Sequence, residues 1–89
     1  MPPAGARHGH ITSRIDRRLG HYVEEIGAGK VFTADTGFVL ERGPDTVRAP
    51  DVAFVSEDRL PRGELPSGFL EMAPDLAVEV VPPSDSADQ

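Results

Sequence analysis

Acidic side chains stand in two apolar runs where a buried strand would normally carry none. The first run, RAPDVAFV at 48–55, contains Asp51, and the second, APDLAVEVV at 73–81, contains Asp75 and Glu79. Runs of Val, Ala, Phe and Leu are typical of strands covered on both faces. A carboxylate buried in such a strand is costly unless it is neutral, paired or bound to a metal. If the two strands are neighbours, we expect Asp51 and Glu79 to converge on one divalent cation.

A pair of carboxylates is a donor set that suits Mg²⁺ or Mn²⁺. Mg²⁺ is usually held by one or two carboxylates, with water and substrate phosphates completing its coordination. Bound to a phosphodiester, such a metal polarises the phosphate and lowers the pKa of the attacking water. The pattern therefore suggests metal-dependent phosphodiester hydrolysis, with Asp51 and Glu79 as catalytic metal ligands. Asp75, four residues before Glu79, is a weaker third candidate ligand.

A structural explanation of the same acids remains open. An Asp after Pro commonly begins a strand or stabilises a turn, which accounts for Asp51 and Asp75 without chemistry. Glu79 would need no partner if one face of its strand were in water. Composition and spacing alone favour this explanation. His8 and His10 are likewise interpreted as solvated side chains and not as ligands.

Composition restricts the class of protein further. With 89 residues and no cysteine, the chain is at most one small domain without disulfides, thiolate metal sites or a Cys nucleophile. No apolar run approaches the length of a membrane span, so we expect a cytoplasmic protein with no membrane partner. The net charge of −6 is uneven: residues 1–50 carry seven Lys and Arg against six Asp and Glu, and residues 51–89 carry two against nine. Such acidity disfavours tight nucleic-acid binding, although the N-terminal arginines form a local basic patch.

Hydrophobic periodicity predicts one helix followed by strands. Apolar residues recur every three or four positions over 10–26, which indicates an amphipathic helix ended by Gly27 and Gly29. Residues 1–9 are rich in Pro, Gly and Ala and are expected to be disordered. Strands are predicted at 30–34 and 38–41 as a hairpin-like pair, then at 47–55 and 75–81, with a short helical turn at 56–60. Pro50 predicts a kink, bulge or edge position just where Asp51 emerges.

The chain resembles the Uma-type family of restriction-endonuclease-like proteins, within the PD-(D/E)XK nuclease superfamily. The likeness runs from about His8 to Ser86. It includes HGHI before the predicted helix and GAGKVF after it. It also includes VRAPDVAFV at 47–55 and APDLAVEVVPPS at 73–84, which are specific to the family in this order and separation.

The resemblance implies an α/β (α+β) fold: a restriction-endonuclease-like mixed sheet with an N-terminal amphipathic helix. Residues 10–89 would be the front part of that domain, incomplete at the C-terminus. Asp51 matches the metal-binding Asp of the superfamily and Glu79 the acid of its (D/E)XK half-motif. Val81 stands where the motif has Lys, and Pro82 where members usually have Ser.

The activity implied by the resemblance is a Mg²⁺- or Mn²⁺-dependent DNA endonuclease, weak or inactive as this chain stands. Two alternatives belong to other functional classes. The first is a non-catalytic remnant of such a nuclease. The second is an interaction module whose fold is completed by another protein or by a second copy, giving a homodimer.

Overall fold

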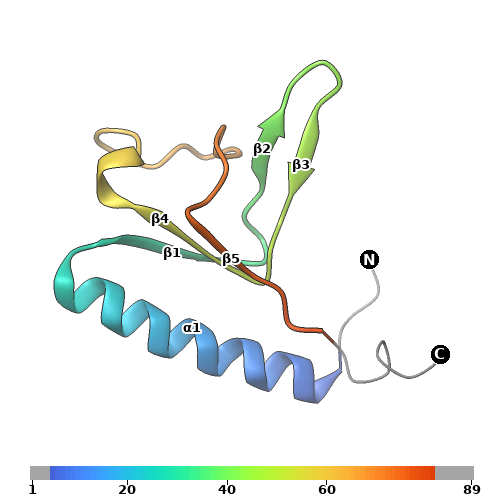
Figure 1. The fold of residues 1–89 in the computed structure, drawn as a ribbon, viewed down its shortest axis with the longest axis vertical. Coiled ribbons are helices and arrows are strands. Elements are labelled where there is room, and N and C mark those ends of the chain that lie inside the picture. The colour runs from blue at the N-terminus through green and yellow to red at the C-terminus, as the bar shows by residue number, and fades with distance from the viewer. Residues whose placement is uncertain (1–4, 82–89) are drawn as a thin grey trace.

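The computed structural model describes residues 5–81, which form one long helix, one short 3₁₀ helix and five strands (Figure 1). In chain order these elements are α1 (Ala6–Ile26), β1 (Gly29–Thr33), β2 (Phe38–Glu41), β3 (Thr46–Arg48), β4 (Val52–Ser56), η1 (Glu57–Arg59) and β5 (Leu76–Val78). The α+β class and the N-terminal helix predicted from the sequence are confirmed. Neither helix in the described part of the chain combines the length and apolar character that crossing a bilayer requires.

Helix α1 ends where the sequence predicts but begins earlier. Gly27 adopts a left-handed conformation (φ 65°) after Ile26. The N–H groups of Gly27 and Ala28 donate to the carbonyls of Glu24 and Val23, at 3.3 and 3.0 Å, which is the Schellman pattern for a helix end. The start at Ala6 places residues 6–9, expected to be disordered, in the first helical turn. The HGHI segment therefore lies inside the helix and not before it.

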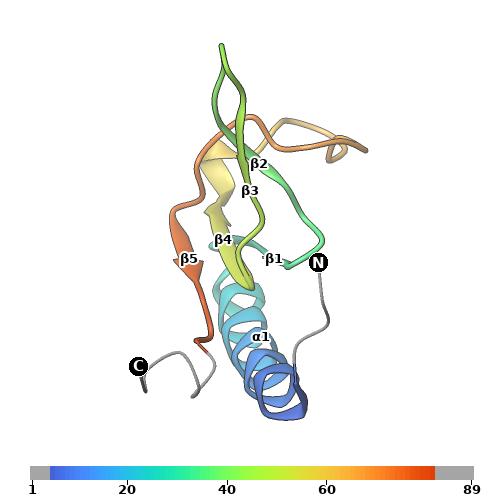
Figure 2. The ribbon, with the colours of Figure 1, turned by 90° about the vertical axis from the view of Figure 1, so that its right-hand side faces the viewer.

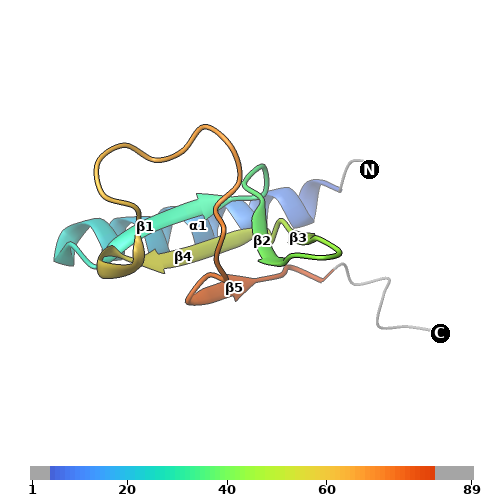
Figure 3. The same cartoon turned by 90° about the horizontal axis from the view of Figure 1, so that it is seen from above.

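The main sheet has the strand order β1–β4–β5, with both pairs antiparallel. Helix α1 packs against β1 and β4, whereas β5 lies to one side of the helix (Figures 2 and 3). Gly29 is required at the start of β1 because its φ of 156° is unfavourable for other residues, and a Cβ there would collide with the carbonyl oxygen of Val55.

Strands β2 and β3 form a separate antiparallel hairpin on the side of the sheet opposite α1 (Figure 1). Two predictions are corrected by this arrangement. The strands at 30–34 and 38–41 do not pair as a hairpin, because β1 pairs with β4 and β2 pairs with β3. The long strand at 47–55 is two strands in different sheets, divided at residues 49–51 around the buried Pro50. Proline lacks the N–H that a continuous ladder would use, and its fixed φ helps to redirect the chain.

The core lies between the main sheet and the hairpin. It is a cluster of buried residues from β2, β4 and the loops that follow β4: Phe38, Ala53, Val55, Leu60 and Leu70. The ring of Phe32 packs edge-on against that of Phe38, with 6.0 Å between the ring centroids. Val52 is fully buried on the other face of β4, toward α1, because successive residues of a strand alternate between faces.

Strand β4 is thus covered on both faces, as predicted, but β5 is not. β5 is an edge strand of three residues, shorter than the predicted 75–81, and Leu76 and Ala77 are exposed. The prediction of a buried final strand is therefore wrong.

Candidate functional site

Asp51 lies between the buried Pro50 and the first residue of β4. The change of direction at Pro50 leaves this residue outside the regular ladder, with a side chain only 18% exposed. Its Oδ2 atom accepts a hydrogen bond of 2.8 Å from the backbone N–H of Val80. The carboxylate therefore reaches from the residue before β4 to the chain that follows β5.

Glu79 lies beside Asp51 through the register of the two strands. Val52 pairs with Val78 in the antiparallel ladder, so Asp51 and Glu79 occupy the next pair of positions outward. Because Val80 N is bonded directly to the carbonyl carbon of Glu79, the 2.8 Å contact brings the Glu79 backbone next to the Asp51 carboxylate. Residue 79 is exposed. The structure therefore places residues 51 and 79 at neighbouring backbone positions at one end of the main sheet.

His8 is a third member of this group, and the sequence interpretation missed it. Its Nε2 atom lies 3.1 Å from Asp51 Oδ2, although the residues are 43 positions apart. The His8 side chain is only 19% exposed, so its interpretation as a solvated side chain is wrong. The only sequence signal for this role is the HGHI segment within the family resemblance.

Asp75 lies at the opposite end of β5 and has different partners. Its Oδ2 accepts a 2.7 Å hydrogen bond from the backbone N–H of Ser56 and lies 2.9 Å from Nη1 of Arg59. The Ser56 N–H and, secondarily, the Arg59 guanidinium lower the pKa of the Asp75 carboxyl. By register, residue 75 is opposite Val55, four residues and roughly 13 Å along the strand from Asp51. Asp75 therefore joins the start of β5 to the end of β4, and the structure does not bring it together with the other two acids.

The donor set at Asp51 and Glu79 fits a hard divalent cation that retains several waters. Two carboxylates are the number that Mg²⁺ commonly takes from a protein, the rest of its shell being water and phosphate. Among residues 5–81 there is no group of three or more His, Asp or Glu side chains arranged to hold a metal by themselves. These two acids therefore suit a metal site whose remaining ligands are water and substrate, and not a site formed by protein side chains alone.

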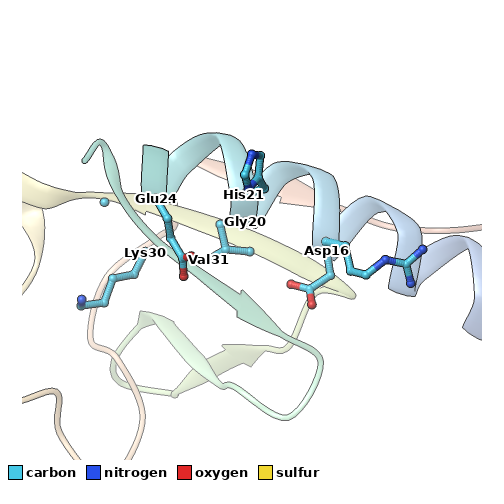
Figure 4. A pocket seen from close by; sticks show the side chains of 8 residues that line it. Asp16, Gly20, His21, Glu24, Lys30 and Val31 are labelled. Carbon is cyan, nitrogen blue, oxygen red and sulfur yellow. The ribbon is translucent and has the colours of Figure 1, made fainter. Parts of the chain in front are cut away.

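The single lysine of the sequence, Lys30, belongs to a different region. It lines a cavity of about 610 Å³ between α1 and the start of β1 (Figure 4). Asp16 and Glu24 project from α1 toward the β1 side of this cavity, so its lining is of mixed charge (Figure 4). Lys30 pairs with Val55, at the end of β4 remote from Asp51. The cavity and the pair of acids are therefore separate features.

Comparison with known proteins gives a family and no individual relative. A family model, Uma2, described as "Putative restriction endonuclease", matches residues 1–89, the whole sequence. No curated protein and no solved structure matches the chain significantly. The match agrees with the resemblance carried by the segments around Asp51 and Glu79.

Proposed function

Because the chain belongs to the Uma2 family, we propose that it carries the metal-binding acids of a DNA nuclease, with Asp51 and Glu79 as the ligands of Mg²⁺ or Mn²⁺. The observation that supports this proposal is the 2.8 Å hydrogen bond from Val80 N–H to Asp51, which brings the backbone of Glu79 next to the Asp51 carboxylate. Asp75 has no ligand role in the proposal, since Ser56 and Arg59 already engage its carboxylate.

The side chains of the proposed site differ in what they contribute. The Val80 N–H holds the largely buried Asp51 carboxylate in place, which reduces the entropy lost when a ligand binds. Glu79 is exposed and can approach a solvent-borne cation or a phosphate carried by it. A bound cation would supply charge stabilisation for the phosphodiester and lower the pKa of an attacking water.

DNA is the substrate class that the family suggests, and α1 offers a basic surface for its phosphates. Arg7, Arg14 and Arg18 are exposed and lie on one face of the helix, at spacings of seven and four residues. Arg7 directly precedes His8, which contacts Asp51, so this basic face begins beside the proposed metal site. Phosphate contacts of this kind give affinity without sequence readout.

Cleavage by these residues is expected to be weak. Superfamily members place a Lys two residues after the acid of the half-motif, whereas this chain has Val81 there and its one lysine at the remote Lys30. At the position of the motif lysine the proposed site therefore carries an apolar side chain and no cation.

Metal binding can be tested by urea unfolding with Mn²⁺ and with EDTA. A ligand at one hundred times its Kd adds about 2.7 kcal/mol to the free energy of unfolding. We expect Asp51→Asn and Glu79→Gln each to abolish most of this gain. Glu64→Gln, at an exposed carboxylate in the loop before β5, is the matched control and should retain it. Equal Mn²⁺ stabilisation of wild type and Asp51→Asn would refute the proposal.

A second candidate function, an interaction module, is favoured by the exposure of β5. Within the described residues this strand pairs only with β4, so its outer edge is available for an added strand. Large apolar side chains are also exposed on α1, among them Tyr22 (62%) and Ile26 (58%). Sedimentation at micromolar concentration tests completion by a second copy, and a strict monomer would argue against it.

A further inference from the structure

Neither the family match nor the sequence assigns a role to the contact between His8 and Asp51. It joins the first turn of α1 to the break before β4, and both side chains are about four-fifths buried. His10, two residues further along the same helix, is exposed. A helix rotates by about 200° over two residues, so only one of these histidines faces the sheet.

Two donors meet on one oxygen of Asp51. Val80 N–H approaches Oδ2 at 2.8 Å, and His8 Nε2 approaches the same atom at 3.1 Å. Since the backbone N–H can only donate and an ionised carboxylate only accepts, His8 donates when its Nε2 carries the proton. No described residue donates a hydrogen bond to Oδ1. The two contacts therefore hold the carboxylate through Oδ2, while Oδ1 has no hydrogen-bond donor among the described residues.

We propose that His8 is a positioning residue, which orients Asp51 through Oδ2 so that Oδ1 binds the divalent cation. The inference rests on the proposed metal-binding function and adds a residue to it. Hydrogen bonds to metal-ligating carboxylates hold them in the binding orientation, and losing such a partner typically weakens metal affinity by about 10- to 100-fold. Without the His8 side chain, only the backbone N–H of Val80 would hold the Asp51 carboxylate.

The test measures Mn²⁺ affinity from the electron paramagnetic resonance signal of the free ion. We expect His8→Ala to raise the Kd for Mn²⁺ by about tenfold. His8→Gln should restore most of the affinity, because the Gln amide nitrogen can occupy the place of Nε2. His8→Asn, whose amide is too short to reach Asp51, should behave like the Ala variant. His10→Ala is the control on the same helix and should bind Mn²⁺ as wild type does.

A purely structural role gives a different pattern. Unfolding in EDTA, measured for every variant, reports loss of stability separately from loss of metal affinity. If His8→Ala fails to fold, the comparison of the Gln and Asn variants carries the test alone. Equal Mn²⁺ affinity in these two variants would overturn the inference while leaving the metal site intact. Absence of Mn²⁺ binding by the wild-type chain would overturn the inference and the proposed function together.

Discussion

Asp51 should stabilise the fold even without metal, and two substitutions can show how. Its carboxylate accepts hydrogen bonds from Val80 N–H at 2.8 Å and His8 Nε2 at 3.1 Å, with 18% of the side chain exposed. Asp51→Asn keeps an oxygen that can accept from Val80 N–H. Asp51→Ala removes both interactions and leaves a half-buried N–H at Val80 without its partner.

The magnitudes follow from the kind of hydrogen bond that is lost. Bonds to a charged group contribute about 1.5–3 kcal/mol and those between neutral groups about 0.5–1.5 kcal/mol, so the Asn variant should lose about 1 kcal/mol. The Ala variant should lose about 3 kcal/mol, because it forfeits a charged hydrogen bond and leaves a donor unsatisfied. For a chain of 89 residues, with about 4–13 kcal/mol in total, the Ala loss is a large fraction.

The assay is urea unfolding in EDTA, followed by circular dichroism. The expected order of stability is wild type, then Asp51→Asn, then Asp51→Ala, with unchanged dependence on urea concentration. If both variants fall within about 0.5 kcal/mol of wild type, the hydrogen bonds of Asp51 do not contribute as reasoned. If Asp51→Asn were less stable than Asp51→Ala, the loss of stability would come from the introduced amide and not from the lost acceptor.

Two further predictions concern the core and the far end of β5. Phe38→Ala, at a fully buried ring that contacts Phe32, should lower the free energy of unfolding by about 3–5 kcal/mol. Tyr22→Ala, at a ring 62% exposed, should cost about 0.5 kcal/mol, and similar losses in the two variants by urea unfolding would contradict the assigned core. The lowered pKa of Asp75 means that its contribution is present above the ordinary value of 3.8 and is lost as the pH falls through the folded-state pKa. The difference in Tm between wild type and Asp75→Asn should therefore be clear at neutral pH and shrink at strongly acidic pH; a constant difference would refute the assignment.

The local elements could be predicted from the sequence, but their pairing could not. The end of α1 was predictable because Gly27 and the preceding apolar stripe lie within a few residues of one another. Its start was not, since Gly5 provides no side-chain cap to mark it. The pairing of β1 with β4 joins residues 19 to 27 positions apart, from Thr33–Val52 to Gly29–Ser56, and no local pattern encodes it. Pro50 predicts a disturbance of the strand, yet whether a proline kinks a strand or sends it into another sheet depends on the surrounding fold.

In the candidate site, too, some residues could be predicted from the sequence and others could not. Asp51 and Glu79 could be selected because each stands out against apolar neighbours, and their adjacency needed only the assumption that the two strands pair. His8 could not be selected this way, because its contact with Asp51 spans 43 residues and depends on a helix that starts at Ala6. A histidine near a chain terminus has no local signature that separates a solvated side chain from one that faces a sheet.

The two acids also differ in how much can be inferred from the apolar residues around them in the sequence. An acid in an apolar run implies chemistry only where the strand is covered on both faces, and β4 meets that condition whereas β5 does not. Asp51 is therefore an acid held by the fold, and Glu79 is an exposed acid that matters through its position beside Asp51. It follows that Asp51→Asn should weaken both folding in EDTA and Mn²⁺ binding. Glu79→Gln should weaken Mn²⁺ binding alone, with a free energy of unfolding in EDTA within about 0.5 kcal/mol of wild type, because an exposed side chain loses little when its charge is removed.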